Sequence, residues 1–328
     1  MIVMKRIFVI ISTILLCVNG FAQKQKYVVG FYNLENLFDI YDEPGKNDEE
    51  FLPDGKNKWT EAKYKKKLFN MAHVIRAMKE DNGVYHTILG VSEIENRLVL
   101  EDLVSQDEIV DANFQIVHYD SPDRRGVDVA LLYRPDQFDY IDSESLPFTF
   151  SPTQVKITLN QEEQDYFRTR DILMVHGLIE GEHFAFYVAH LPSRIGGKGS
   201  DLRSRGAEII YNHASEMEKK YPGIKIVVMG DMNDNPTDES MTVWMHGKGD
   251  VKDVRQGDYF SPFTKMLADG YGSLAYQGTW NIYDVILTNY NLTVAPDGGL
   301  KICKIHKKGY YGRVFKKPFM TQQTGQYK

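Results

Sequence analysis

Cysteine is nearly absent from this chain, and so is any excess of basic residues. Its 328 residues include two cysteines, and 39 Lys and Arg stand against 45 Asp and Glu, which gives a formal net charge of -6. An acidic surface argues against tight non-specific binding to nucleic acid, because such binding depends on Lys and Arg that neutralise phosphates. It does not exclude a nuclease whose metal ion supplies the local positive charge.

The chain also lacks an apolar run of the roughly 20 residues that a membrane span needs. The apolar core at residues 7–18 follows two basic residues and precedes small residues. This layout predicts a signal peptide over residues 1–22 and export to the periplasm or the outside, with no membrane span after cleavage. Cys17 follows a leucine, which favours cleavage over lipidation. The mature chain then keeps only Cys303 and folds without an internal disulfide.

The rest of the composition, 42% apolar and 26% charged, is that of a soluble globular protein with a substantial core. No internal repeat or low-complexity linker divides it, so we expect one domain over residues 23–328 and a monomer. Several strands follow one another across tight turns, which favours antiparallel pairing. We expect strands near 27–32, 87–93, 114–118, 127–133, 172–179, 184–189, 226–229 and 283–288, helices near 60–79, 97–104 and 202–220, and a long surface loop at 40–58.

Strands that arrive in hairpins with few helices between them do not fit a series of parallel βαβ units. They fit an α+β fold in which two mostly antiparallel sheets pack face to face and helices cover the outside, a four-layer α/β/β/α sandwich.

The clearest chemical signal is the apolar run that ends in Gly230-Asp231 and continues through Asn233 into a turn. Asp231 and Asn233 are two residues apart, so on an extended backbone they project to the same side. There a carboxylate can hold a hard cation or a water, while an amide orients a phosphoryl oxygen. The alternative is an ordinary Asx-type turn after a strand.

Four other expected strands also carry a polar residue at or near an end: Asn33, Glu93, His190 and Asp284. Nothing structural calls for an acid after the long apolar run that precedes Glu93. His190 could instead be a buried core histidine, and Asn33 could cap a turn. Polar groups of these types at strand ends predict a site at the rim of a sheet.

Taken together, these five motifs resemble those of the endonuclease/exonuclease/phosphatase superfamily, the deoxyribonuclease I-like metal-dependent phosphoesterases. The resemblance covers nearly the whole mature chain in the expected order. It implies that Glu93 is the main ligand of a Mg²⁺ or Mn²⁺ ion, with Asn33 beside it, as suits a hard, oxygen-seeking cation.

The same resemblance assigns roles to the other residues. His190 would contact the phosphate and stabilise charge on its oxygens. Asp231 would orient or deprotonate water, and Asn233 would hold the phosphate. Asp284 matches the aspartate that in relatives orients a histidine near the C-terminus.

That C-terminal histidine is where the sequence departs from the family. The family closes its sheet with a Ser-Asp-His-x-Pro motif, and no Asp-His dipeptide occurs in this chain. His306 has no preceding Asp and is a poor substitute. Either the chain stops before its last strand or this member has lost the motif, and the abrupt polar ending favours truncation at the C-terminus.

The sequence therefore predicts an exported, divalent-metal-dependent phosphoesterase, foremost a nuclease-like phosphodiesterase that acts on a phosphodiester such as nucleic acid, or on a phosphomonoester. The alternatives are a lipid or inositol phosphatase, including a sphingomyelinase-like enzyme, and a catalytically dead member that binds a phosphorylated ligand. Asp128 and Tyr133 could line the cleft or be structural. Four basic residues could contact phosphate or be ordinary surface or salt-bridged groups: Arg194, Lys198, Arg203 and Arg205.

Overall fold

Two β-sheets pack face to face in the computed structural model, which describes residues 26–194, 199–276, 278–305 and 309–320. The expected signal peptide, Lys198, His306 and residues 321–328 lie outside these ranges. The first sheet has four strands, in the spatial order β1 (Val29–Leu37), β2 (Ile88–Ile94), β4 (Asp128–Tyr133) and β3 (Gln115–His118).

The second sheet has seven strands. In spatial order they are β5 (Asp139–Leu146), β6 (Ile172–Ile179), β7 (Glu182–His190), β8 (Lys225–Asp231), β13 (Asp284–Asn289), β10 (Tyr259–Phe260) and β9 (Gly247–Lys248). A separate small hairpin joins β11 (Leu274–Tyr276) to β12 (Thr279–Asn281).

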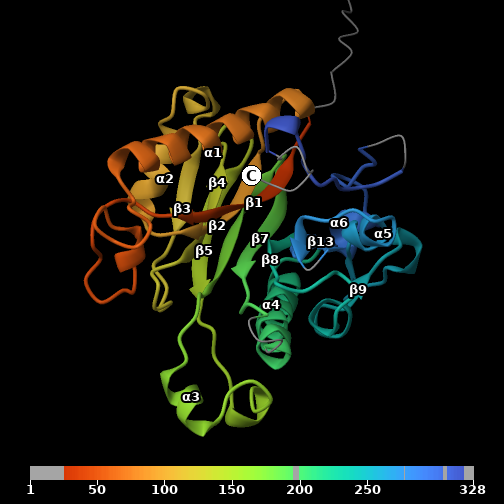
Figure 1. Cartoon of the computed structure of the whole chain (residues 1–328). Coiled ribbons are helices and arrows are strands. Elements are labelled where there is room, and N and C mark those ends of the chain that lie inside the picture. Colours follow the sequence, from red (N-terminus) through yellow and green to blue (C-terminus); the bar gives the residue numbers. More distant parts are fainter. Residues whose placement is uncertain (1–25, 195–198, 277, 306–308, 321–328) are drawn as a thin grey trace, which may run out of the picture.

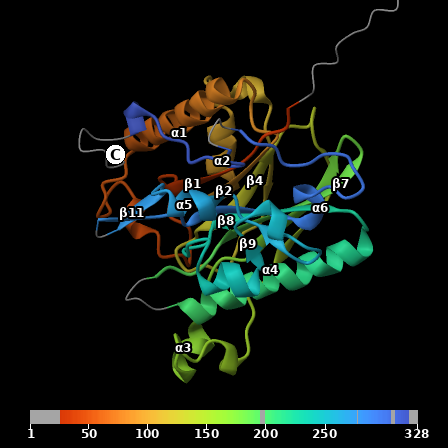
Figure 2. The ribbon, with the colours of Figure 1, turned by 90° about the vertical axis from the view of Figure 1, so that its right-hand side faces the viewer.

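Helices lie on the outer faces of both sheets, so the fold has four layers. Figures 1 and 2 show α1 on one side of the strands and α4 on the other. The α-helices are α1 (Glu61–Asn82), α2 (Arg97–Val104), α3 (Gln161–Tyr166), α4 (Ser200–Lys220), α5 (Phe263–Ala268) and α6 (Tyr290–Thr293). A π-helical turn lies at Ser240–Trp244, and 3-10 turns lie at 49–51, 110–112, 152–154, 251–253 and 318–320. No helix among the described residues is both long and apolar enough to cross a membrane.

Side chains alternate between the two faces of each strand, so the strands contribute to three apolar clusters. One lies between the two sheets, and one lies between each sheet and its helices. In β2, Leu89 and Val91 pack into the cluster shared with α1 and α2, whereas Ile88 packs into the cluster between the sheets. In β8, Val227 and Met229 face the first sheet while their neighbours face α4. Strands buried on both faces in this way read as continuous apolar runs, as the sequence does.

The two sheets approach each other closely at Gly90 of β2. A Cβ atom there would lie 2.6 Å from Met229 Sδ and 3.2 Å from Val188 Cγ2, both on the second sheet. Glycine at this position lets the two sheets pack without a side chain between them.

The expected α+β architecture is confirmed, with details that the sequence did not predict. The two predicted hairpins form as β3–β4 and β6–β7, both antiparallel. Three pairs are parallel: β1 with β2, β7 with β8, and the short edge strands β9 and β10. The first two pairs are each connected through a long helix, α1 and α4. Strand β5 was not predicted, because as an edge strand it carries mostly exposed polar side chains.

Candidate active site

The register of the strands brings the predicted polar residues to one rim of the sandwich. In the second sheet, Asp231 at the end of β8 lies opposite His190 of β7 on one side and Asp284 of β13 on the other. In the first sheet, Asn33 of β1 pairs with Ser92 of β2, the residue before Glu93. Both sheets therefore deliver polar side chains to the same edge.

Backbone irregularities at this rim turn the side chains of β1 and β2. The pairing of β2 with β4 shifts between Ser92 and Ile94, and the skipped residue, Glu93, has a φ of 57°. β1 shifts its pairing after Asn33, where Glu35 also has a positive φ of 52°. Non-glycine residues rarely adopt such angles, and bulges of this kind re-aim side chains next to functional sites. The regular alternation would have sent Glu93 toward α1 and α2, and the bulge points it at the second sheet.

Hydrogen bonds show how closely these groups converge. Asn33 Nδ2 donates to Glu93 Oε1 at 3.1 Å and to Asp231 Oδ2 at 3.2 Å. Asn33 Oδ1 accepts from the Glu35 amide at 2.8 Å, which fixes the orientation of the side-chain amide. In this arrangement Asn33 holds the two carboxylates together through its nitrogen.

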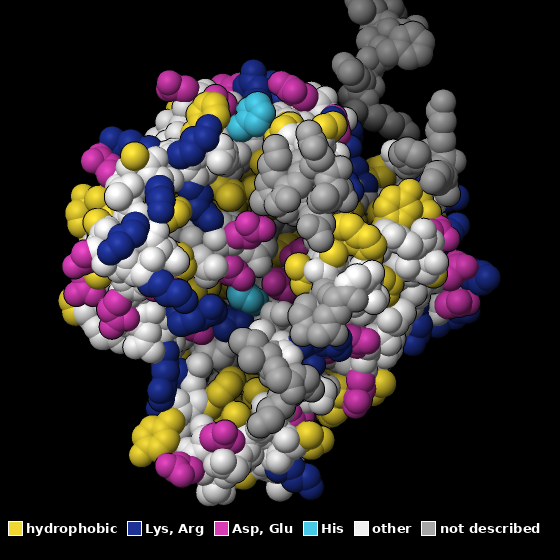
Figure 3. Space-filling view, in the orientation of Figure 1, with side chains coloured by type: hydrophobic (Ala, Val, Ile, Leu, Met, Phe, Trp, Pro, Cys, Tyr) yellow, Lys and Arg dark blue, Asp and Glu magenta, His cyan; other side chains and the backbone are white. Residues whose placement is uncertain are grey.

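His190 completes the cluster. Its Nε2 lies 3.9 Å from Glu93 Oε1 and 3.8 Å from Asp231 Oδ2, and one ligand atom from each of the three residues lies within 4.8 Å of the others. Figure 3 shows a histidine and several acidic side chains together near the middle of the face toward the viewer, with Lys and Arg gathered to their left.

Asn233 belongs to the same loop as Asp231. Its backbone N–H donates to Asp231 Oδ1 at 3.0 Å, and its Nδ2 donates to the Leu191 carbonyl at 2.9 Å. Asn233 also has a positive φ of 51°. These contacts lock the end of β8 to the residue after His190, so the structure places Asn233 beside the cluster.

Repulsion between the carboxylates adds to burial in raising the pKa values of Asp231 and Asp284. Burial, followed by the charge of Asp231, raises the pKa of Asp284 to about 7, although a hydrogen bond from Ser273 opposes the shift. Burial and the charge of Glu93 raise the pKa of Asp231, against hydrogen bonds from Asn233 and Asn33. Such a group of acids is short of positive charge, and a divalent cation would supply it.

His190 is buried and electrically neutral. Burial, and then the charges of Arg170 and Arg125, hold the pKa of His190 well below its usual range. Its Nδ1 is buried and has no hydrogen-bond partner among the described residues. Nε2 is the nitrogen that faces the carboxylates, and a neutral imidazole that carries its proton on Nε2 can donate a hydrogen bond to an oxygen of a bound ligand.

No sequence pattern predicted the buried ion pair between Arg170 and Asp123, which holds the backbone at His190. Arg170 Nη1 donates to Asp123 Oδ2 at 3.1 Å, its Nε to the His190 carbonyl at 3.0 Å, and its Nη2 to the Leu191 carbonyl at 2.9 Å. Asp123 and Arg170 lie 47 positions apart in the chain, and no local pattern links them.

Three of the four basic residues considered from the sequence make ion pairs. Arg203 is buried and pairs with Asp234 at 2.7 Å, and Arg205 pairs with Glu208 at 2.6 Å. Arg194 lies 2.8 Å from Asp234 and stacks on the Tyr283 ring, 5.4 Å from its centroid. Of these three described residues, Arg194 is the one that is both partly exposed and next to the strand that carries Asp284.

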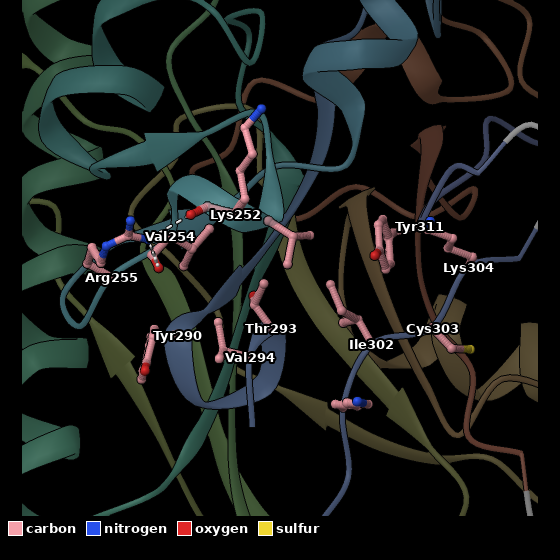
Figure 4. A pocket seen from close by; sticks show the side chains of 12 residues that line it. Lys252, Val254, Arg255, Tyr290, Thr293, Val294, Ile302, Cys303, Lys304 and Tyr311 are labelled. Atoms are coloured by element: carbon pink, nitrogen blue, oxygen red, sulfur yellow. Dashed lines mark hydrogen bonds between the residues drawn. The ribbon is translucent and has the colours of Figure 1, made fainter. Parts of the chain in front are cut away.

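A cavity of about 760 Å³ lies elsewhere, beyond the far end of β13 (Figure 4). Figure 4 shows α6 and the segment with Cys303 on its walls. Its lining includes Lys252, Arg255, Lys301 and Lys304, and no acid or histidine occurs among the described residues that line it. In the described part of the chain its lining includes Cys303 but no carboxylate for a hard divalent cation, so the candidate site for Mg²⁺ or Mn²⁺ is the cluster at the rim.

Comparison with known proteins adds a family and a fold. A model described as the Endonuclease/Exonuclease/phosphatase family matches residues 28–328. A mannosyl-6-phosphatase of Bacteroides thetaiotaomicron has a similar structure, with 16% identity, a TM-score of 0.51, and coverage of 80% of this chain and 85% of that chain. No curated protein sequence matches the chain.

Two further solved structures are similar at lower scores. An endonuclease/exonuclease/phosphatase family protein from Bacteroides thetaiotaomicron has 14% identity and a TM-score of 0.49, covering 80% of this chain and 81% of that one. The human Nocturnin catalytic domain has 16% identity and a TM-score of 0.44, covering 67% and 75%. At such identities the likeness concerns the fold alone.

Proposed function

Since this chain belongs to the Endonuclease/Exonuclease/phosphatase family, we propose that it is an exported, divalent-metal-dependent phosphoesterase whose first substrate class is the phosphodiester, nucleic acid included. The observation that carries the proposal is the convergence of Glu93, Asp231 and His190 from two sheets on one rim. The leader-like layout of residues 1–22 supports export.

The donor set fits a hard divalent cation. Glu93 Oε1 and Asp231 Oδ2 both accept from the Asn33 amide, so two carboxylate oxygens already face a common point. Carboxylate oxygens are the ligands that Mg²⁺ and Mn²⁺ prefer. Bound there by Glu93 and Asp231, such an ion would supply charge neutralisation for the phosphoryl oxygens. Asn33 would serve as a direct ligand through Oδ1 only by releasing the Glu35 amide.

The chain's own residues divide the remaining work. Asp231, held by the Asn33 amide and the Asn233 backbone N–H, orients the attacking water and accepts its proton. His190 stays neutral and donates a hydrogen bond to a phosphoryl oxygen, where charge grows in the transition state. Asn233 holds the loop that orients Asp231. Asp284, on the other side of Asp231, increases the negative field at that carboxylate.

A lipid-directed activity, that of a sphingomyelinase-like enzyme or lipid phosphatase, is the second candidate, and one feature favours it. The segment between β5 and β6, which carries α3, projects from the sheets (Figures 1 and 2), and Arg170 near its end donates to the His190 carbonyl. It exposes 75% of Ile157 and 64% of Tyr166, and Arg124 of the adjacent hairpin donates to the Tyr166 carbonyl at 2.7 Å. Exposed apolar side chains next to a polar site suit a lipid substrate.

The experiment compares four substrates with one protein: plasmid DNA, bis-p-nitrophenyl phosphate, p-nitrophenyl phosphate and sphingomyelin vesicles. We expect Mg²⁺ or Mn²⁺ to support phosphodiester cleavage and a chelator to abolish it. Glu93→Gln should remove this activity, whereas Glu101→Gln, an exposed glutamate on α2 paired with Arg97, should leave it unchanged.

Three other outcomes would change or contradict this assignment. Cleavage of sphingomyelin alone would replace the nucleic-acid assignment with the lipid one. Binding of phosphate without turnover of any substrate would show a catalytically dead member. Activity that survives the chelator, or that Glu93→Gln leaves intact, would contradict the proposal itself.

A further inference from the structure

A second group of potential metal ligands lies in the β3–β4 hairpin. His118 ends β3, Asp128 begins β4, and Asp120 lies in the turn between them. His118 Nε2 is 3.1 Å from Asp128 Oδ2 and 3.9 Å from Asp120 Oδ1, and the three ligand atoms lie within 4.8 Å of one another. Two of these side chains are almost fully buried, with 3% of His118 and 2% of Asp128 exposed.

This group is separate from the candidate active site. Alternate residues of β4, Ala130 and Leu132, pack toward α1 and α2, and Asp128 shares their parity. Ile116 of β3 packs against the same cluster and shares the parity of His118. The group therefore lies on the outer face of the first sheet, whereas the bulge at Glu93 turns that side chain toward the inner face.

The surroundings of this group carry uncompensated negative charge. Asp48 is buried, and its Oδ1 has no partner among the described residues, while its Oδ2 accepts from the Glu43 amide at 2.9 Å. Burial, and the charges of Asp120, Asp128 and Asp48, raise the pKa of Glu43, with Lys46 opposing. Lys46 Nζ is engaged by the Ser121 carbonyl at 3.0 Å. Two of these carboxylates, Asp48 and Asp128, are buried, and such burial is costly unless a further positive charge joins them.

We propose that His118, Asp120 and Asp128 form a second metal site, which binds a transition-metal ion such as Mn²⁺ or Zn²⁺ in preference to Mg²⁺. An imidazole nitrogen with two carboxylate oxygens suits these ions, whereas Mg²⁺ prefers oxygen ligands alone. Binding requires Nε2 of His118 to be unprotonated, with the ring proton on Nδ1.

A metal ion in this second site would stabilise the backbone of the candidate active site. The hairpin turn that it closes carries Asp123, whose carboxylate binds Arg170, and Arg170 in turn holds the carbonyls of His190 and Leu191. An ion that fixes the turn thereby fixes the backbone on which His190 sits. His118 and its two partners are positioning residues in this scheme.

Calorimetric titration with Mn²⁺, without Mg²⁺ and in excess Mg²⁺, tests the proposal. We expect two Mn²⁺ ions per chain without Mg²⁺ and one in excess Mg²⁺, because Mg²⁺ occupies only the site at Glu93. Asp120→Asn should weaken the remaining site by more than the roughly 10–100-fold that loss of an outer-shell partner costs. The side chain of Asp120 is 79% exposed, so this variant keeps the fold.

Three further variants sharpen the result. His118→Gln should also lose the Mn²⁺ site that persists in excess Mg²⁺, whereas Glu93→Gln should keep that site. Asp54→Asn replaces an exposed aspartate on another loop and should bind Mn²⁺ as wild type does. If Asp120→Asn binds Mn²⁺ as tightly as wild type in excess Mg²⁺, or if Glu93→Gln removes the persisting site, the proposal is wrong. It stands apart from the proposed function, because Mn²⁺ binding is measured without substrate.

Discussion

Asp284 is the buried acid whose replacement most directly tests the charge balance of the site. Its carboxyl group lies beside Asp231, and its pKa is raised to about 7 by burial and then by Asp231. The unfolded chain has the ordinary value of 3.8. Between pH 4 and 7 the folded state therefore binds more protons at this residue than the unfolded state does, so its contribution to stability is lost as pH rises through 7.

The size of the loss follows from the shift. About three pKa units correspond to about 4 kcal/mol at 1.36 kcal/mol per unit. Asp231 shares the repulsion, so the value for Asp284 alone is smaller, and we expect about 2–4 kcal/mol above pH 7. Asp284→Asn removes the charge and keeps the shape. The metal-free variant should therefore be more stable than wild type at pH 8, and the difference should vanish near pH 4.

Urea unfolding at several pH values between 4 and 8, with a chelator present, measures this difference. Asp54→Asn is the matched control, an aspartate on the surface whose loss should leave the pH dependence unchanged. Mg²⁺ should abolish the advantage of Asp284→Asn, because a bound cation compensates the same charges. A variant that loses stability at pH 8, or that follows the wild-type curve at every pH, would refute the account of the cluster.

Three other substitutions test separate parts of the structure. Glu93→Gln should keep the fold and weaken Mg²⁺ binding more than about tenfold, and calorimetry showing unchanged affinity would refute the ligand assignment. Asp123→Ala should cost about 3–5 kcal/mol in chemical unfolding, since it leaves Arg170 buried and unpaired, and a loss below 1 kcal/mol would contradict that role. Gly90→Ala should cost about 1–3 kcal/mol, because its Cβ would meet Met229 Sδ at 2.6 Å, and wild-type stability would show that the sheets can part.

Much of the site could be predicted because its residues share one simple pattern. Apolar runs buried on both faces are visible in a sequence, and the polar residue at the end of each run marks the rim where strands stop. Asp231, His190 and Glu93 were found in this way, and the register of β7, β8 and β13 places the first two side by side. Glu93 reaches these two residues only through the bulge in β2.

The remainder depends on contacts that leave no local trace. The bulge that redirects Glu93 is a single backbone angle within an ordinary strand. Arg170 and Asp123 meet only because distant segments pack together. Strand β5 has exposed polar side chains and is recognisable only by its pairing with β6. In each case the decisive interaction is tertiary, so neither spacing nor composition could indicate it.

The central claim is that Glu93 and Asp231 hold one divalent cation at the rim shared by the two sheets. Crystals of the protein soaked in Mn²⁺ test it most directly, through the anomalous signal of the ion. We expect a peak within about 2.0–2.3 Å of a carboxylate oxygen of Glu93, near Asp231 and His190. Strong Mn²⁺ peaks elsewhere, with none beside Glu93 in wild-type crystals, would contradict it.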